Sequence, residues 1–270
     1  MLVLILAEMY AEGEAMLAFP HSLLVVCVGV QTGMYGFDYY GQWTTKQGTG
    51  RAGGLALAVG MIGYTASLLG IYQLLYRTDF FWSTLLAYGA YVFFSVLYAI
   101  PPMHFNAKGG GSVLLFFMNG VILVQLVTLS LNIGYSLQAL LLCVPSNLLL
   151  QASLVVQELA ATEHRGLTTT AGLLGKHGSF RFVVLMHAFA YFLVLVDFAS
   201  ISFSRGLPLV LAVWSLVLFY SLRQGKVSGL WKSAYRLFLT FTLLSAVGIM
   251  LESEHFSSDI QAKYSTISLH

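Results

Sequence analysis

Eight long apolar stretches divide the chain, and short segments rich in glycine, proline or charged residues separate them. A transmembrane α-helix needs about 20 predominantly apolar residues to cross the hydrocarbon core of a bilayer. The pattern therefore predicts an all-α protein, a polytopic transmembrane helical bundle with eight full spans. The predicted spans are Pro20 to Phe37, Ala52 to Tyr76, Phe80 to Ile100, Val113 to Leu131, Tyr135 to Val156, Phe182 to Ile201, Leu207 to Leu222 and Ala234 to Leu251.

The two ends of the chain differ from these spans. Met1 to Ala7 is apolar but too short to cross a membrane alone, and three glutamates follow it closely. We interpret this segment as an N-terminal partial span. Residues 252–270 are polar and form a predicted C-terminal tail. The whole chain, 1–270, is thus predicted to be a single transmembrane helical domain.

Composition and charge agree with a membrane protein and suggest its orientation. Hydrophobic residues make up 58% of the chain and charged residues 9%, whereas soluble domains carry about 25% charged residues. If the eight spans alternate, ten of the thirteen Lys and Arg residues fall on one side. The positive-inside rule makes that side cytoplasmic and puts the C-terminus on the opposite side. The same bias explains the basic residues without a nucleic-acid partner, so membrane lipids are the predicted surroundings.

Glycines recur along the second span, at Gly53, Gly54, Gly60, Gly63 and Gly70. Small residues let membrane helices approach closely. The pattern predicts tight helix packing along this span.

Three polar segments carry the motifs of the chain. The stretch YAIPPMHFNAKGGGS runs from Tyr98 to Ser112 after the third span, and QEL (157–159) and GLTTTAGLLG (166–175) follow the fifth. With the spans between them, these stretches resemble the UbiA superfamily of intramembrane prenyltransferases. The resemblance implies a UbiA-like bundle with an apolar cavity open to lipid, and chemistry at its cytoplasmic loops.

Aspartate is missing where this resemblance implies it, since the chain has none between Asp79 and Asp197. Family members bind an isoprenyl diphosphate through two aspartate-rich motifs, the first of the form Asn-Asp-x-x-Asp. The matching residues here, FDYYG (37–41), keep only Asp38. In the second motif, Glu158 and Glu163 are the remaining carboxylates.

The chemistry of the family explains why this loss matters. A diphosphate leaving group needs Mg²⁺ to neutralise its developing charge, and Mg²⁺ requires oxygen ligands in near-octahedral geometry. Asp38 has Gly41 and Gln42 where a partner on the same helical face would lie, and Glu158 and Glu163 are five residues apart. The predicted metal site, Asp38 and Glu158, is therefore weak. No catalytic residue is firmly assigned; Asp38, Glu158 and Glu163 are the candidates if the protein is active.

Six residues near these motifs are candidates for contact with the head group of a ligand. They combine aromatic, amide and basic side chains, although basic loops also arise from topology alone. The predicted ligand-binding residues are Tyr39, Tyr40, His104, Asn106, Lys108 and Arg165.

These observations lead to one principal hypothesis and two alternatives. The first is a catalytically degenerate UbiA-like protein, a structural or isoprenoid-, quinone- or pigment-binding subunit of a larger membrane complex that contains other membrane protein subunits. The second is a divergent Mg²⁺-dependent prenyltransferase that moves a prenyl group from an allylic diphosphate to an aromatic or lipid acceptor. The third is a haem- or pigment-bearing anchor through the intramembrane His187, for which a structural role is the commoner explanation.

Overall fold

The computed structural model describes residues 21–47, 51–75, 79–101, 103–105, 109–165, 169–200, 203–225 and 229–267. Within these ranges the chain forms helices and connecting turns and no strand, which confirms the predicted all-α class. Eight long helical segments are present in this part of the chain. They are α2 (His21–Gln47), α3 (Arg51–Leu75), α4 (Phe81–Ala99), a continuous run of α5 (Gly111–Phe117), π-helix η1 (Met118–Ile122) and α6 (Leu123–Ser130), then α7 (Leu137–Arg165), α8 (Thr170–Ser200), 3₁₀-helix η2 (Phe203–Leu211) running into α9 (Ala212–Arg223), and α10 (Leu230–Ile267).

Seven of the described helical segments are long and apolar enough to cross a membrane, which indicates an integral membrane protein. They correspond to seven of the eight predicted spans. The remaining segment, α2, corresponds to the first predicted span and is 27 residues long. Gln31, Thr32 and Asp38 interrupt its apolar sequence, so its composition does not meet the hydropathy expected of a membrane span. The predicted partial span, Met1 to Ala7, lies outside the described residues.

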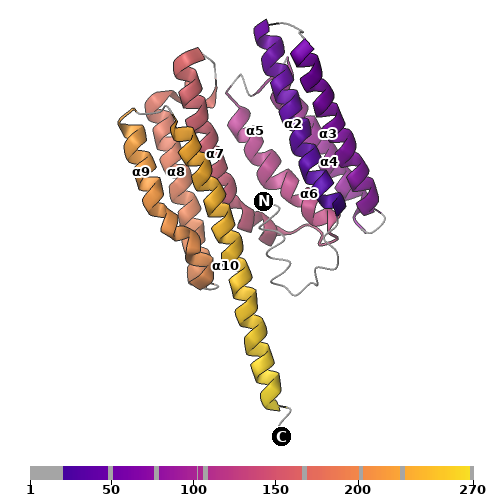
Figure 1. Ribbon diagram of the computed structural model, residues 1–270, viewed down its shortest axis with the longest axis vertical. Helices are drawn as coiled ribbons and strands as arrows, with labels where there is room; N and C mark the ends of the chain where they lie inside the picture. The colour runs from indigo at the N-terminus through magenta and orange to yellow at the C-terminus, as the bar shows by residue number, and fades with distance from the viewer. Residues whose placement is uncertain are drawn as a thin grey trace.

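Several helices extend beyond the predicted spans. The first continues ten residues past Phe37, and the fifth continues to Arg165. Neither extension contains proline, so nothing in the backbone stops the helix when the apolar sequence ends. The predicted C-terminal tail is also helical up to Ile267, and α10 projects beyond the other helices (Figure 1). At about 1.5 Å per residue, its 38 residues are longer than the hydrocarbon core is thick.

The helices form two groups that meet along α7 (Figure 1). In the first, α2, α3 and α4 pack together with the α5–η1–α6 run, and their buried side chains include Leu23, Tyr91, Met118 and Val124. In the second, α7, α8, α9 and α10 enclose a core that includes Val155, Leu218 and Leu237. The C-terminal ends of α2, α7 and α9 lie at one end of the bundle (Figure 1). The motif segments therefore share one end of the molecule.

Glycine contacts bring α2 and α3 backbone to backbone. A Cβ atom at Gly63 would lie 2.7 Å from the amide nitrogen of Gly33 and 2.8 Å from the carbonyl oxygen of Gly29, and one at Gly36 would lie 2.6 Å from the Cα of Gly60. Real Cβ atoms do not approach other atoms this closely. These positions therefore require glycine, and the partner glycines on α2 were not part of the prediction.

The remaining predicted glycines on α3 behave differently from one another. Gly70 packs against the carbonyl oxygen of Ser22 at the start of α2, and Gly53 lies under the Trp43 ring. Gly54 faces open space, with nothing within 4 Å of a Cβ built there. The prediction of close packing is thus confirmed for four of the five glycines and wrong for Gly54.

We expect Gly63→Ala to lower the free energy of unfolding in detergent by about 1–3 kcal/mol, because its methyl group overpacks the α2–α3 contact. Gly54→Ala is the matched control on the same helix. It changes helix propensity by the same amount but meets no neighbouring atom, so stability should be unchanged or slightly raised. Thermal unfolding of both variants checks this; equal stability of the two would contradict it.

Candidate functional site

The structure brings Asp38 and Glu158 to the same end of the bundle. Asp38 lies nine residues before the end of α2 and Glu158 near the end of α7, so they come from different helix groups. The phenol of Tyr98, at the end of α4, is buried, and both carboxylates lie near enough to interact with it electrostatically. We refer to Asp38, Tyr98 and Glu158 as the carboxylate cluster. Tyr98 belongs to the motif stretch, but no feature of that stretch predicted a role for it.

Within this cluster, Glu158 is engaged by two other helices. The hydroxyl of Ser112, in α5, donates to Oε1 at 3.3 Å, and the backbone amide of Ala171, in α8, donates to Oε2 at 3.0 Å. Each carboxylate oxygen thus accepts a hydrogen bond from the protein itself. Hydrogen bonds to a charged acceptor are stronger than neutral ones, so Glu158 fastens α5, α7 and α8 together at this end.

The Gly/Thr-rich motif forms the start of α8. The Thr169 hydroxyl accepts from the amide of Gly172 at 3.2 Å, which is the usual role of threonine at a helix N-cap. Gly175 adopts φ 64° and ψ 177° and breaks the helix after its first turn, a conformation that favours glycine. The Ser179 hydroxyl then donates to the Ala171 carbonyl at 3.2 Å and spans this break. Thr169 and Gly175, both within the motif stretch 166–175, thus have local structural roles.

At Gly41 there is no room for a ligand side chain. The resemblance implies an aspartate at this position, but a Cβ atom built here would overlap the carbonyl oxygen of Ala99, at the end of α4. The same Cβ would lie 3.5 Å from Nε2 of His104, which is buried with φ 40°. The end of α4 and the turn after it therefore pack directly against the backbone of α2.

Asp38 and Glu158 both accept hydrogen bonds from groups of the protein. Oδ2 of Asp38 accepts from the Gln42 amide at 2.9 Å, and the Glu158 oxygens are engaged as described above. Among the described residues, no three His, Cys, Asp or Glu side chains group closely enough to hold a metal ion. The side chain of Glu163, on the last turns of α7, lies outside the described part of the structure. Metal binding by Asp38 and Glu158 stays a prediction without the oxygen shell that Mg²⁺ requires.

Three of the predicted ligand-binding residues, Tyr39, Tyr40 and His104, have described side chains. Tyr39 is 53% exposed and stacks on Trp43, with ring centroids 6.3 Å apart, whereas His104 is buried. Tyr40 is half-buried. Asn106 and Lys108 lie outside the described residues, and Arg165 is described only as the last backbone position of α7.

His187 has structural contacts within the bundle. Its Nδ1 lies 2.8 Å from the carbonyl oxygen of Val183, and because a carbonyl only accepts, Nδ1 carries the proton. Its ring packs edge-on against Phe219, with centroids 5.0 Å apart. These contacts explain a buried histidine in α8 without a pigment.

A buried amide network in the first helix group was missed by the sequence reasoning. Gln31 Nε2 donates to Tyr91 Oη and to Asn119 Oδ1, both at 3.2 Å, and the Tyr91 hydroxyl donates to Asn119 Oδ1 at 3.2 Å. Asn119 lies in the π-helix η1, and the Asn147 amide donates to the Phe116 carbonyl just before it at 3.0 Å. The signal was available, because Gln31 and Asn119 interrupt apolar spans.

No protein-family model matches this chain, and no curated protein matches it.

We expect Glu158→Ala to lower the free energy of unfolding in detergent by about 1–3 kcal/mol, because it leaves the Ala171 amide without its acceptor. Glu158→Gln should cost less, since its carbonyl oxygen can still accept from Ala171. Gln157→Ala, at the exposed neighbouring position, is the control and should be neutral. An effect of Glu158→Ala no larger than that of the control would rule out this anchoring role.

Proposed function

We propose that this protein is a noncatalytic, UbiA-like membrane protein that serves as a structural or isoprenoid-binding subunit of a larger membrane complex. In this proposal, all eight helical segments, α2 included, span the membrane. The motif-bearing end faces the cytoplasm, following the distribution of basic residues. An isoprenoid tail, such as that of a quinone or pigment, is the proposed ligand.

The contact between Gly41 and Ala99 carries this proposal. Where the resemblance implies a second aspartate, the end of α4 packs against the α2 backbone and leaves no space for a side chain. Replacing one residue would not recreate the ligand, because a backbone carbonyl lies in its place. At the position where the resemblance implies this aspartate, α2 and α4 are thus in close backbone contact.

The role of Glu158 supports the same conclusion. A carboxylate that recruits Mg²⁺ for diphosphate chemistry must present its oxygens to the ion. Here Oε1 and Oε2 point to Ser112 and to the Ala171 amide. These contacts suit a residue that holds three helices in place.

The apolar outer surface of the bundle is suited to lipid and to partner subunits. Large hydrophobic side chains on α3, α8 and α9 are more than half exposed, for example Ile62, Leu185 and Val213. Such surfaces are normal for helices in a bilayer. They also offer the contact area that a subunit of a membrane complex needs.

One observation favours the competing function, a divergent prenyltransferase. Asp38 and Glu158 come from different helix groups, and the charges of both reach Tyr98. This convergence is what two separated motifs around one substrate would produce. The two functions make opposite predictions for Asp38.

We expect stoichiometric partner subunits, an isoprenoid, or both to co-purify with the tagged protein in mild detergent, and to be retained by Asp38→Asn. Mass spectrometry of proteins and extracted lipids provides the measurement. The side-chain amide oxygen that this substitution introduces can still accept from Gln42, so the variant should fold. Mg²⁺-dependent transfer from an allylic diphosphate by the wild type, lost in Asp38→Asn, would instead establish the enzyme.

We expect Gly41→Asp to destabilise the protein, although it restores an aspartate of the family motif. The overlap with the Ala99 carbonyl involves Cβ itself, so Gly41→Ala should also lose stability, by about 1–3 kcal/mol or more. Size-exclusion chromatography and thermal unfolding in detergent compare both with the wild type. A well-folded Gly41→Asp protein that gains Mg²⁺-dependent prenyl transfer would overturn the proposal.

A further inference from the structure

Exposed cations collect on the second helix group, at the end of the bundle that carries the motifs. They lie near the starts of α8 and α10 and at the last residue of α9, and each has an exposed side chain. The set consists of Lys176 and Arg181 on α8, Arg223 on α9, and Lys232 and Arg236 on α10. We refer to these five residues as the basic surface.

Contacts between the three helices bring parts of this surface together. A Cβ atom built at Gly225, just after the end of α9, would lie 2.9 Å from Nζ of Lys176, so this ammonium group of α8 reaches the C-terminal end of α9. The Trp214 indole of α9 donates to the Ser233 hydroxyl of α10 at 3.0 Å, which joins α9 to the first turns of α10. The basic surface therefore extends over three neighbouring helices.

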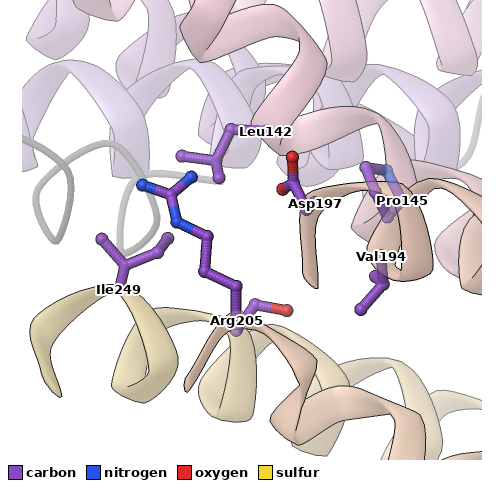
Figure 2. A pocket seen from close by; sticks show the side chains of 7 residues that line it. Leu142, Pro145, Val194, Asp197, Arg205 and Ile249 are labelled. Atoms are coloured by element: carbon purple, nitrogen blue, oxygen red, sulfur yellow. The ribbon is translucent and has the colours of Figure 1, made fainter. Parts of the chain in front are cut away.

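Carboxylates near this end are already engaged within the protein. Among the carboxylates with described side chains, Asp38 and Glu158 are the two at the motif end, and both accept hydrogen bonds from groups of the protein. At the other end of α8, by contrast, Arg205 lines the same cavity as Asp197 (Figure 2). A cation at that end thus has a carboxylate beside it, whereas the basic surface presents its charge to the surroundings of the bundle.

One face of α10 continues from cations into apolar side chains. Lys232 and Arg236 are four residues apart, and positions three or four residues apart lie on one face of a helix. The same spacing continues through apolar residues that are 39–59% exposed, which are Leu239, Leu243, Val247 and Met250. Positive charge followed by an apolar strip matches the form of a phospholipid, whose phosphate lies at the membrane surface and whose acyl chains enter the hydrocarbon core.

Aromatic residues place these two cations at the level of the lipid head groups. Trp231 is 36% and Tyr235 43% exposed, and Trp and Tyr are enriched at membrane interfaces. The Lys232 ammonium lies 5.8 Å from the centroid of the Trp231 ring, within the range of a cation–π contact. The apolar span Leu230–Leu251 begins at the same place. The cations and the phosphates of a surrounding bilayer therefore lie at a similar depth.

The charge of the basic surface selects the class of lipid. An arginine guanidinium binds phosphate oxygens in a bidentate manner, and a lysine binds them as a point charge. A zwitterionic lipid brings its own cation to this positive surface, whereas an anionic lipid does not. The surface therefore favours a phospholipid with a net negative charge.

We propose that the basic surface binds the head group of an anionic phospholipid, with the phosphate on Lys232 and Arg236 and an acyl chain along the exposed face of α10. Lys176 and Arg223 contribute further positive potential beside this site. The proposal depends on insertion into a membrane, and is independent of whether the protein is an enzyme or a subunit of a complex.

Native mass spectrometry of the full-length protein in detergent tests this with phosphatidylglycerol and phosphatidylcholine of matched acyl chains. The wild type should retain phosphatidylglycerol in preference to phosphatidylcholine. The double variant Lys232→Gln/Arg236→Gln should retain phosphatidylglycerol about 25-fold less, because each cation near a membrane surface changes the binding of an anionic lipid about fivefold. Its retention of phosphatidylcholine should change little.

Three further variants make the result interpretable. Arg51→Gln removes an exposed cation from the start of α3, at the same end of the bundle but in the first helix group, and should behave as the wild type. The charge-conserving double variant Lys232→Arg/Arg236→Lys should also retain phosphatidylglycerol. Arg236→Gln alone should lose about fivefold, which keeps the test decisive if the double variant folds poorly.

Two results would overturn the proposal. The first is equal retention of the two lipids by the wild type. The second is a loss of phosphatidylglycerol in Lys232→Gln/Arg236→Gln no greater than that in Arg51→Gln. Either result would mean that these cations orient the protein in the membrane without binding a particular lipid.

Discussion

Close backbone contact between α2 and α3 is the interaction on which the first half of the bundle depends. In a bilayer, apolar side chains gain little by meeting each other instead of lipid, so packing and hydrogen bonds must hold helices together. Gly63 meets the backbone of Gly29 and Gly33, and Gly36 meets that of Gly60. The rings of Tyr64 and Phe37 pack against Gly33 and Gly60. This contact sets the position of α2 relative to its neighbours, and with it the places of Asp38 and Gly41.

The position of α2 also affects the residues near Asp38. Because α2 packs closely against α3, the end of α4 contacts the α2 backbone at Gly41. Tyr98, at the end of α4, then lies near enough to Asp38 and Glu158 to interact with both electrostatically. In the second half, hydrogen bonds to Glu158 hold the helices together, because they join the starts of α5 and α8 to the end of α7. Glycine contacts thus position the helices of the first half, and hydrogen bonds to a carboxyl group position those of the second.

This arrangement explains how the bundle accommodates Asp38 and Glu158 at one end. Repulsion between clustered carboxylates would destabilise a site that has no cation to neutralise them. Here a hydroxyl and a backbone amide donate hydrogen bonds to Glu158, and the Ala99 carbonyl packs against the α2 backbone at Gly41. At the opposite end of α8, Asp197 and Arg205 line one cavity and carry opposite charges.

The sequence by itself determined the fold class, the approximate spans and the glycine-rich face of α3, because each depends on the length or period of a local pattern. It also indicated where aspartates were missing. It did not determine how far helices continue beyond the apolar spans, as α2 and α7 do, since the end of an apolar stretch does not stop a helix when no proline follows. Nor did it reveal that Gly41 meets Ala99, that Glu158 accepts from Ser112 and Ala171, or that Asp197 and Arg205 share a cavity. Only the tertiary structure decided these, because each contact joins different elements, and its geometry depends on helix positions that no local pattern specifies.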